Sequence, residues 1–360
     1  MNKIKGILIS TLLLLSILTI IAPVSAGTVH VYPGDDIGAK LQGAASGDTV
    51  YVHAGSYTIS NNTDIFNKSL TIIGDGSSNT IINFSGNVTL GFRLSSGTSN
   101  VNVNISGITF KGDSSTYRLM LFVNSLANYT IITSVKDCVF DRANGECLLI
   151  DGQNNNSIII ATIENCEFKN AGTYGGLEAH HYSQATVKNC LFHDNKFGLN
   201  FIQYSQATIQ SCTFDKNTDS GIQITSDASS NTIKDCIITN NTLNGISKSG
   251  TSTLTNTYNN VWNNGTNYSG TTAGAGSISQ NPSYATGRLG SYYLYPSSPC
   301  VDKGSASSAF IGLDKMTTRT DEHWDTGTVD MGYHYSSNRG PQTSLPIDFI
   351  LKLLKKNKNK

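Results

Sequence analysis

Residues 187–192 read Val-Lys-Asn-Cys-Leu-Phe, and residues 209–214 read Ile-Gln-Ser-Cys-Thr-Phe. Near-copies of this phrase occur five times at spacings of 22 to 28 residues, centred on Cys138, Cys166, Cys190, Cys212 and Cys236. A period of this length, made of short β-type runs, is typical of a solenoid in which each repeat forms one turn. The phrase therefore predicts an all-β parallel solenoid.

The alternation of apolar and polar residues assigns faces to the strands. In each phrase, Cys and the residue two positions later are predicted to point inward. A second strand, introduced by Gly, follows each phrase, and its inward residues are Leu177, Ala179, Leu199, Phe201, Ile222 and Ile224. Its outward residues are predicted to form one column of Glu178, Asn200, Gln223 and Ser247.

Two more patterns predict ladders of stacked side chains along the axis. An asparagine stands three residues after the last core residue of four repeats, at Asn195, Asn217, Asn241 and Asn264. Stacked asparagines can hydrogen-bond to one another, and they suit a tight bend. The run Tyr-Ser-Gln-Ala-Thr begins at Tyr182 and again 22 residues later at Tyr204, so these tyrosines are expected to stack.

The chain divides into a leader, a repeat domain and a tail. The predicted segments are a signal peptide over 1–26, a parallel β-helix domain over 27–335, and a linker with a basic amphipathic tail over 336–360. Within the domain we expect an N-terminal cap with a short helix over 27–48, repeats over 49–265, and an irregular closing segment over 266–335.

The leader has the three parts of a secretory signal. Lys3 and Lys5 supply positive charge, residues 7–21 are apolar, and small residues allow cleavage after Ala26. An uncleaved membrane anchor is the alternative, but the apolar run is short for a span of about 20 residues. The mature protein is therefore predicted to be secreted or held at the cell surface.

The tail joins an apolar stretch, 345–354, to a lysine-rich end. A basic amphipathic segment can lie on a membrane surface, so peripheral membrane contact is one interpretation. A docking helix or a frayed basic end is favoured, because the apolar part is far below spanning length.

Seven cysteines in an exported chain would ordinarily suggest disulfides. Residues one turn apart stack about 4.8 Å apart with parallel side chains, whereas a disulfide needs Cβ atoms about 3.8 Å apart and a twisted dihedral. The five phrase cysteines therefore predict a buried column of thiols, with pairing after a small shift as the alternative. No metal site is predicted there, because no histidine follows at ligand spacing, and the state of Cys147 and Cys300 is left open.

Both ends of the domain carry longer motifs. Residues 45–53 read Ala-Ser-Gly-Asp-Thr-Val-Tyr-Val-His, and residues 325–332 read Asp-Thr-Gly-Thr-Val-Asp-Met-Gly. With these motifs and the repeat, the chain resembles the right-handed parallel β-helix proteins of the pectin-lyase-like superfamily, more narrowly those exported by bacteria and archaea. The resemblance covers nearly all of the mature chain. It implies three strands per turn and a carbohydrate-linked or cell-surface role, but no single activity.

Enzymes of that superfamily act from the outer face of the strands, and their motif sets are absent here. The sequence lacks the polygalacturonase-like set with Gly-His-Gly, the pectate-lyase-like Trp-x-Asp-His phrase and the epimerase-like Asp-Pro-His-Asp phrase. The best remaining catalytic candidates are Glu178, His180, His181, His193, Asp194 and Lys196. They could form an acid/base pair in a groove beside Asn200 and Gln223. A solvated solenoid face is the favoured alternative, and convergence of these side chains is not established by the sequence.

Two other features of the sequence could form binding sites. Tyr182 and Tyr204 could stack on sugar rings, although a structural ladder is equally consistent. Five residues of the closing segment could offer oxygen ligands to Ca²⁺, although a role in the cap loops is favoured: Asp321, Glu322, His323, Asp325 and Asp330. No other cofactor is predicted.

These features lead to three function hypotheses. The favoured one is an exported or surface β-helix that binds a polysaccharide or builds a cell-envelope layer. The second is a secreted polysaccharide-acting enzyme, a lyase before a glycoside hydrolase, and the third is a structural spacer or adhesin. A formal net charge of zero argues against nucleic acid as a partner.

Overall fold

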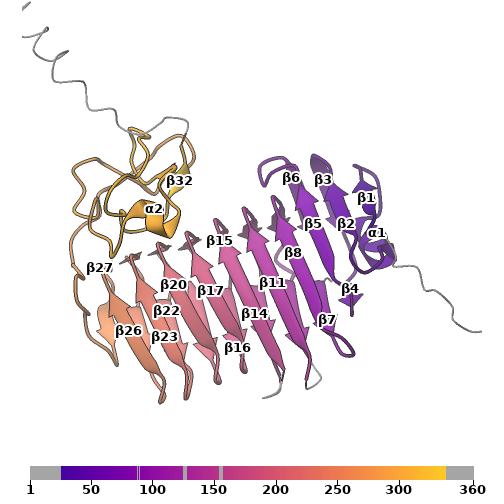
Figure 1. The fold of residues 1–360 in the computed structure, drawn as a ribbon, viewed down its shortest axis with the longest axis horizontal. Coiled ribbons are helices and arrows are strands. Elements are labelled where there is room, and N and C mark those ends of the chain that lie inside the picture. Colours follow the sequence, from indigo (N-terminus) through magenta and orange to yellow (C-terminus); the bar gives the residue numbers. More distant parts are fainter. Residues whose placement is uncertain (1–25, 87, 89, 125–127, 154–156, 338–360) are drawn as a thin grey trace, which may run out of the picture.

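The computed structural model describes residues 26–86, 88, 90–124, 128–153 and 157–337. The chain forms an elongated parallel β-helix in which three parallel sheets run along one axis (Figure 1). Each turn contributes one strand to sheet A, then one to sheet B, then one to sheet C. The predicted fold class, an all-β parallel β-helix with a short N-terminal helix and an irregular closing segment, is confirmed.

The three long sheets contain ten, nine and nine strands. Sheet A consists of β1 (Thr28–Val31), β2 (Thr49–Val52), β5 (Leu70–Gly74), β8 (Val101–Ser106), β11 (Thr130–Lys136), β14 (Ile158–Glu164), β17 (Gln184–Lys188), β20 (Gln206–Gln210), β23 (Ser230–Lys234) and β26 (Thr253–Thr257). Sheet B consists of β3 (Gly55–Ile59), β6 (Thr80–Phe84), β9 (Thr109–Lys111), β12 (Val139–Asp141), β15 (Glu167–Lys169), β18 (Leu191–His193), β21 (Thr213–Asp215), β24 (Ile237–Thr239) and β27 (Asn260–Trp262). Sheet C consists of β4 (Thr63–Phe66), β7 (Leu90–Ser96), β10 (Arg118–Asn124), β13 (Glu146–Asp151), β16 (Gly175–His180), β19 (Leu199–Ile202), β22 (Ser220–Thr225), β25 (Asn244–Lys248) and β28 (Thr266–Ser269).

A single apolar core runs through the β-helix. The six residues predicted to point inward from sheet C are all fully buried. Phenylalanines at the centre of the sheet B strands stack along the axis, and the ring centroids of Phe168 lie 4.8 Å from those of Phe140 and Phe192. This distance is the spacing of neighbouring strands, so the rings repeat in step with the backbone.

A left-handed backbone residue makes the bend between sheets A and B. It stands directly before each phrase cysteine, with φ between 50° and 59°, at Asp137, Asn165, Asn189, Ser211 and Asp235. Asn and Asp tolerate this conformation better than most residues, which explains the Asp-Cys and Asn-Cys pairs of the phrase. The following cysteines enter the core. All seven cysteines of the chain are buried and none forms a disulfide, although Cys300 belongs to a separate cluster with the closing segment. The predicted thiol column is confirmed.

The asparagine ladder holds the bend between sheets B and C. The Nδ2 group of Asn195 donates to Asn217 Oδ1 at 3.2 Å, and Asn217 Nδ2 donates to Asn241 Oδ1 at 2.8 Å. Asn241 continues the ladder to Asn264 at 2.8 Å. These side chains also accept from backbone N–H groups of the preceding turn, so the ladder satisfies polar groups that the bend would otherwise bury unpaired.

Helix α1 (Ile37–Gly43) covers the N-terminal end of the core. The Asp36 side chain caps it by accepting from the Ala39 N–H at 2.9 Å, and Ile37 and Leu41 are buried in the core. The closing segment follows β28, which extends the repeats to Ser269. It contains α2 (Ser308–Ile311) and two short antiparallel pairs, β29 (Tyr284–Ala285) with β30 (Tyr293–Leu294) and β31 (Met316–Thr317) with β32 (Tyr335–Ser336).

The closing segment folds back over sheet B (Figure 1). The His334 N–H donates to Asn189 Oδ1 at 2.7 Å, and Asn189 Nδ2 donates to the His334 carbonyl at 3.0 Å. The Ser305 N–H donates to Asp235 Oδ1 at 2.6 Å. Both partners on the β-helix are bend residues that precede a phrase cysteine, so the repeat itself supplies the docking points.

The predicted signal peptide and amphipathic tail lie almost wholly outside the described residues, and both stay predictions. Within the described part of the chain, the structure contains no helix long and apolar enough to cross a membrane.

We expect Asn217→Ala to lower the free energy of unfolding by about 1–3 kcal/mol, because it removes hydrogen bonds from a fully buried bend. Urea denaturation would measure the change. The exposed Asn61→Ala is the matched control and should change stability by less than about 0.5 kcal/mol. Equal effects of the two substitutions would contradict the role assigned to the ladder.

Ellman's reagent should find no reactive thiol in the native protein, because burial excludes the reagent from every cysteine. After unfolding in guanidinium without reductant, it should titrate all seven. A count below seven in the unfolded protein would reveal a disulfide and would refute the thiol column.

Candidate functional site

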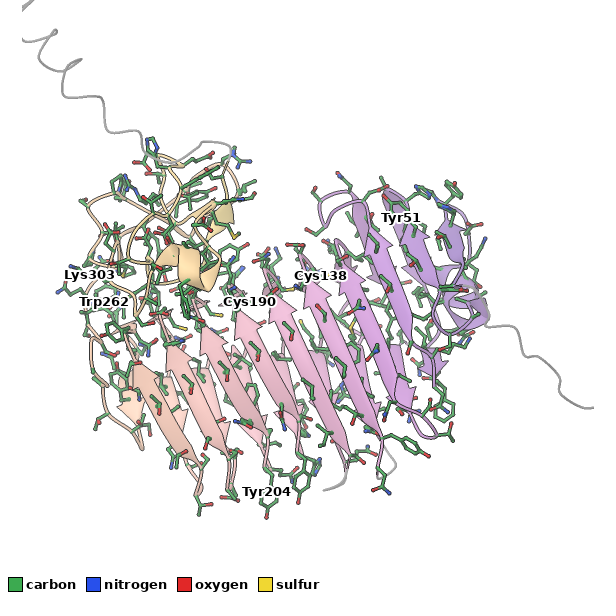
Figure 2. All side chains as sticks on the ribbon, in the orientation of Figure 1. Tyr51, Cys138, Cys190, Tyr204, Trp262 and Lys303 are labelled. Carbon is green, nitrogen blue, oxygen red and sulfur yellow. The ribbon has the colours of Figure 1, made fainter. Side chains whose placement is uncertain are left out.

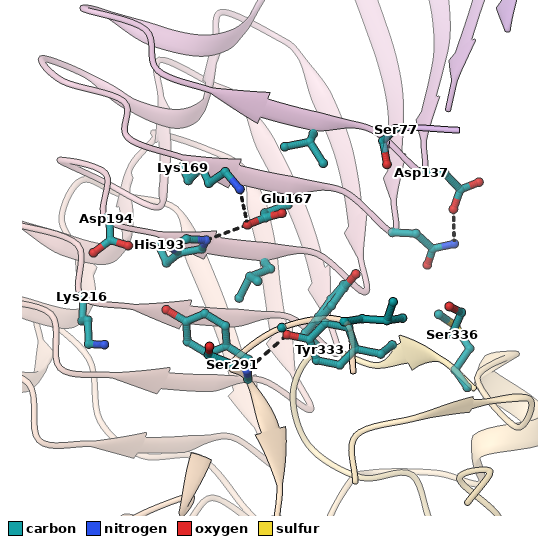
Figure 3. Close-up of a pocket in the computed structure, with 18 residues that line it drawn as sticks. Ser77, Asp137, Glu167, Lys169, His193, Asp194, Lys216, Ser291, Tyr333 and Ser336 are labelled. Carbon is teal, nitrogen blue, oxygen red and sulfur yellow. Dashed lines mark hydrogen bonds and ion pairs between the residues drawn. The ribbon is translucent and has the colours of Figure 1, made fainter. Parts of the chain in front are cut away.

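A groove of about 690 Å³ crosses the outer face of sheet B (Figure 3). Its floor is formed by strands β12, β15 and β18, which contribute Val139, Glu167, Lys169, Leu191 and His193. The closing segment forms one wall with residues 289–292 and 333–336, and Ser77 lies on the other side. The groove therefore exists only because a non-repeating segment docks on a repeating face.

The short strands of sheet B decide which side chains face the groove. Each has three residues, and the central phenylalanine points into the core, so the first and third residues point outward. The register then places Glu167 beside Leu191 and Lys169 beside His193. The outward pairs of two successive turns thus form a compact floor of three polar side chains and Leu191.

The floor carries a continuous charge network. Glu167 Oε1 lies 2.9 Å from Lys169 Nζ and 2.9 Å from His193 Nε2. The other ring nitrogen of His193, Nδ1, lies 2.6 Å from Asp194 Oδ2. Both nitrogens of His193 therefore face carboxylate oxygens, an arrangement that only the doubly protonated imidazolium satisfies completely.

The pKa shifts agree with this geometry. Burial alone would lower the pKa of His193, but its hydrogen bonds to Glu167 and Asp194 outweigh burial and raise the pKa above 6.5. Burial alone would raise the pKa of Glu167, but His193 and Lys169 outweigh it and lower the pKa. The network is thus a charged one, and His193 has no free nitrogen to act as a general base in this state.

Tyr292 links the wall to the floor. Its ring centroid lies 5.3 Å from that of His193, and its hydroxyl donates to Asp215 Oδ2 at 3.2 Å. Burial, followed by the negative charge of Asp215, raises the pKa of Tyr292 far above its ordinary value. Tyr292 therefore stays a neutral hydroxyl that holds the closing segment to β21.

The predicted catalytic residues are distributed over two faces. His193 and Asp194 lie in the sheet B groove, whereas Glu178 and His180 point outward from β16 in sheet C. Lys196 lies beyond the bend, with Nζ 5.4 Å from the centroid of the Phe197 ring. The six candidates do not converge on one site, because the asparagine bend separates the two sheets.

The predicted ligand residues Asn200 and Gln223 lie beside Glu178 on sheet C. Register pairing places Asn200 between the other two, and its Nδ2 group donates to Glu178 Oε1 at 2.6 Å. Glu178 is only 3% exposed and Asn200 only 7%. Both side chains are therefore largely closed to a ligand, and Asn200 Oδ1 is buried without a hydrogen-bond partner.

Tyr182 and Tyr204 stack as predicted, with centroids 5.1 Å apart and planes within 6°. They stand at the bend from sheet C to sheet A, where Tyr204 projects from the lower edge in Figure 2. Both have positive φ, 42° and 62°, which is unusual for a bulky residue. A hollow of about 330 Å³ beside them is lined by Gln184 and Gln206 from adjacent turns. Whether the pair binds a sugar stays a prediction.

The acidic residues predicted as a calcium site separate into different contacts. Asp321 pairs with Arg319, and Glu322 pairs with Arg288. Asp325 and Asp330 instead approach Asp302, with one oxygen of each carboxylate within 4.8 Å of the others.

The carboxylates of Asp325 and Asp330 already accept hydrogen bonds from the protein. Asp330 accepts from the Asp302 N–H at 2.7 Å and from Thr318, and Asp325 Oδ2 accepts from the Asp330 N–H at 2.9 Å. Asp325 Oδ2 also lies 2.8 Å from Nε2 of the fully buried His334. This network suits closure of the segment, and Ca²⁺ binding there stays a prediction.

Sequence reasoning did not single out Glu167, Lys169 and Tyr292. A signal for the first two was available, because Glu167 and Lys169 flank Phe168, the inward residue of the phrase, and so fall on the two outward positions of the strand. No such signal existed for Tyr292, which belongs to the segment without a period.

Comparisons with known proteins agree with the fold. Residues 120–283 match the family described as "Right handed beta helix region". This protein is a right-handed parallel β-helix. A comparison with curated protein sequences found no match.

Several solved structures are similar to this chain at low identity. Pectate lyase Pel9A is 9% identical over 87% of this chain and 97% of its own, with a TM-score of 0.37. The catalytic domain of a GH87 alpha-1,3-glucanase in complex with nigerose is 12% identical over 68% of this chain and 56% of its own, with a TM-score of 0.38. Pectin methylesterase PemA from Erwinia chrysanthemi is 9% identical over 62% of this chain and 66% of its own, with a TM-score of 0.26. Similarity of this size does not carry an activity from one β-helix to another.

The raised pKa of His193 makes stability depend on pH. Because the folded protein holds this proton more tightly than the unfolded chain, the stabilisation is fully present below 6.5 and is lost as the pH rises through the raised pKa. The difference in unfolding free energy between wild type and His193→Gln should therefore shrink above pH 6.5. Urea denaturation from about pH 6 to about pH 9 would test this, with His53→Gln as the control. A difference that stays constant over this range would contradict the charged network.

Proposed function

We propose that this protein binds a polysaccharide in the groove over sheet B. The observation that carries the proposal is the fixed donor and acceptor array in an open groove, formed by Lys169, Glu167, His193 and Asp194. Sugar rings present closely spaced hydroxyl groups that both donate and accept. An array with ammonium, imidazolium and carboxylate groups side by side can pair with such hydroxyls along one face of the ligand.

Accessibility supports this use of the array. The side chains of Asp194 and Lys216 are 50% and 63% exposed at the groove, so their polar atoms stay available to a ligand. Glu167 and His193 are more enclosed, at 27% and 14%, and their mutual contacts hold them in place. A preorganised floor with exposed charged groups at its edge is suited to binding, because little side-chain freedom is lost at the centre.

The same geometry favours binding over cleavage. A general base needs a free lone pair, and both nitrogens of His193 are engaged by carboxylates. Lys169 is paired with Glu167, and the hydroxyl of Tyr292 is committed to Asp215. A secreted polysaccharide lyase or glycosidase is the second candidate, supported by the two carboxylates that flank His193 in an open groove.

Export belongs to this proposal. It rests on the sequence pattern of residues 1–26, which supports secretion or a position at the cell surface. The paired tyrosines at Tyr182 and Tyr204 offer an independent contact for sugar rings on another edge of the molecule. A contact between the basic tail and a membrane surface would hold the protein at its site of action.

A glycan array with mature residues 27–360 would test binding. Lys169→Ala and Glu167→Gln should each weaken it by about tenfold or more, the effect of losing one charge-assisted hydrogen bond. Lys40→Ala is the matched control, because Lys40 pairs with Asp35 at 3.6 Å in the N-terminal cap and neither residue lines the groove. Control and wild type should bind equally.

The alternatives give different results in the same experiment. Absence of binding to every glycan, or equal binding by all variants, would contradict the proposed groove. Reducing ends or unsaturated products released from uronate polymers would establish the enzyme, and we expect none.

A further inference from the structure

Three metal-ligating side chains converge at the end of sheet C, away from the groove. Asp151 ends β13, His180 ends β16, and the two are register partners on adjacent strands. Both residues therefore point outward from successive turns at the same height along their strands. His181 follows in a left-handed conformation, with φ of 36°.

The conformation of His181 brings its ring back to the preceding turn. Its Nδ1 lies 2.8 Å from Asp151 Oδ1. One donor atom from each of Asp151, His180 and His181 lies within 4.8 Å of the other two. The described part of the chain contains two groups of three side chains that could hold a metal ion. The second group, Asp302, Asp325 and Asp330, contains no histidine.

Asp151 and His181 are hydrogen-bonded at 2.8 Å, and a metal ion would replace this bond by coordinating both atoms together with His180. Tetrahedral zinc holds His nitrogen and carboxylate oxygen at about 2.0–2.2 Å, which places neighbouring donors roughly 3.3 Å apart. Small side-chain rotations bring a group already within 4.8 Å to that geometry. Two imidazoles and one carboxylate suit zinc-type ions, whereas Ca²⁺ prefers oxygen ligands alone.

The surroundings of His180 support a metal site independently. Its Nε2 is buried without a hydrogen-bond partner, although Glu178 Oε1 lies only 3.3 Å away. Glu178 is itself held by Asn200 and is 3% exposed. A carboxylate behind a histidine is the usual arrangement that orients a metal-bound imidazole and fixes its tautomer. Glu178 would thus act as a positioning residue, which gives a role to a carboxylate that the sheet B groove does not use.

The site is also accessible. The side chains of His180 and His181 are 22% and 34% exposed, and that of Asp151 is 14% exposed. Three protein ligands at a surface leave a fourth position for water or an oxygen of a ligand.

We propose that Asp151, His180 and His181 bind one divalent transition-metal ion of the zinc type. The ion joins two successive turns of the β-helix at the bend that also carries Tyr182. The proposal is independent of glycan binding in the sheet B groove, since the two sites share no residue.

Isothermal titration of the untagged mature protein with Zn²⁺, at a pH where histidine is neutral, tests the site. One ion per chain is expected to bind and to raise Tm. His181→Ala and Asp151→Ala should each weaken binding at least about 100-fold, and Glu178→Gln by about tenfold. Co²⁺ in place of Zn²⁺ should give the intense visible absorption of a tetrahedral site, and Ca²⁺ should not compete.

His53→Ala is the matched control. His53 Nε2 lies 3.0 Å from His30 Nδ1 near the N-terminus, so this pair is the competing place for adventitious zinc. The control should bind as wild type does. Binding that survives His181→Ala but is lost in His53→Ala would overturn the proposal, as would absence of binding in wild type. Unchanged circular dichroism and metal-free Tm would establish that each variant is folded.

Discussion

The spacing of parallel strands is the constraint on which the rest of the structure depends. Hydrogen bonds hold neighbouring strands about 4.8 Å apart, so a residue and its equivalent one turn later lie directly above one another. The rings of Phe168 and Phe192 have this spacing, and Asn195 and Asn217, also one turn apart, are close enough to share a hydrogen bond. Each turn therefore stabilises its two neighbours, and the core is a continuous column with its ends covered by other elements.

The same stacking decides what the outer faces can carry. Like charges directly opposite on neighbouring strands repel. Along sheet B the register places Asp141, Lys169, His193 and Asp215 in one row. The two neighbouring cations of this row, Lys169 and His193, both contact Glu167 Oε1, and this shared carboxylate offsets their repulsion. On sheet C the register sets Asp151 beside His180. A β-helix thus converts a sequence repeat into rows of side chains at fixed spacing, and both candidate sites are built from such rows.

A row of side chains makes a surface, and a wall is needed to make a groove. The closing segment supplies that wall by docking on bend residues, with hydrogen bonds between His334 and Asn189 and between Ser305 and Asp235. The positive-φ conformation of these bend residues turns the chain, so their side chains stay available to the segment. Stability at the C-terminal end and the shape of the groove therefore depend on the same contacts.

The sequence by itself determined the period, the inward residues, the thiol column, the asparagine ladder and the tyrosine pair. It could do so because equivalent residues stack and alternate residues face opposite sides, which are local rules. It named His193 and Asp194 but grouped them with Glu178 and His180, because a linear pattern does not reveal the angle that a bend creates between two sheets. Only the tertiary structure joined His193 to Glu167 one turn earlier and to Tyr292 in the closing segment. That segment has no repeat, so its path follows from side-chain docking rather than from the period.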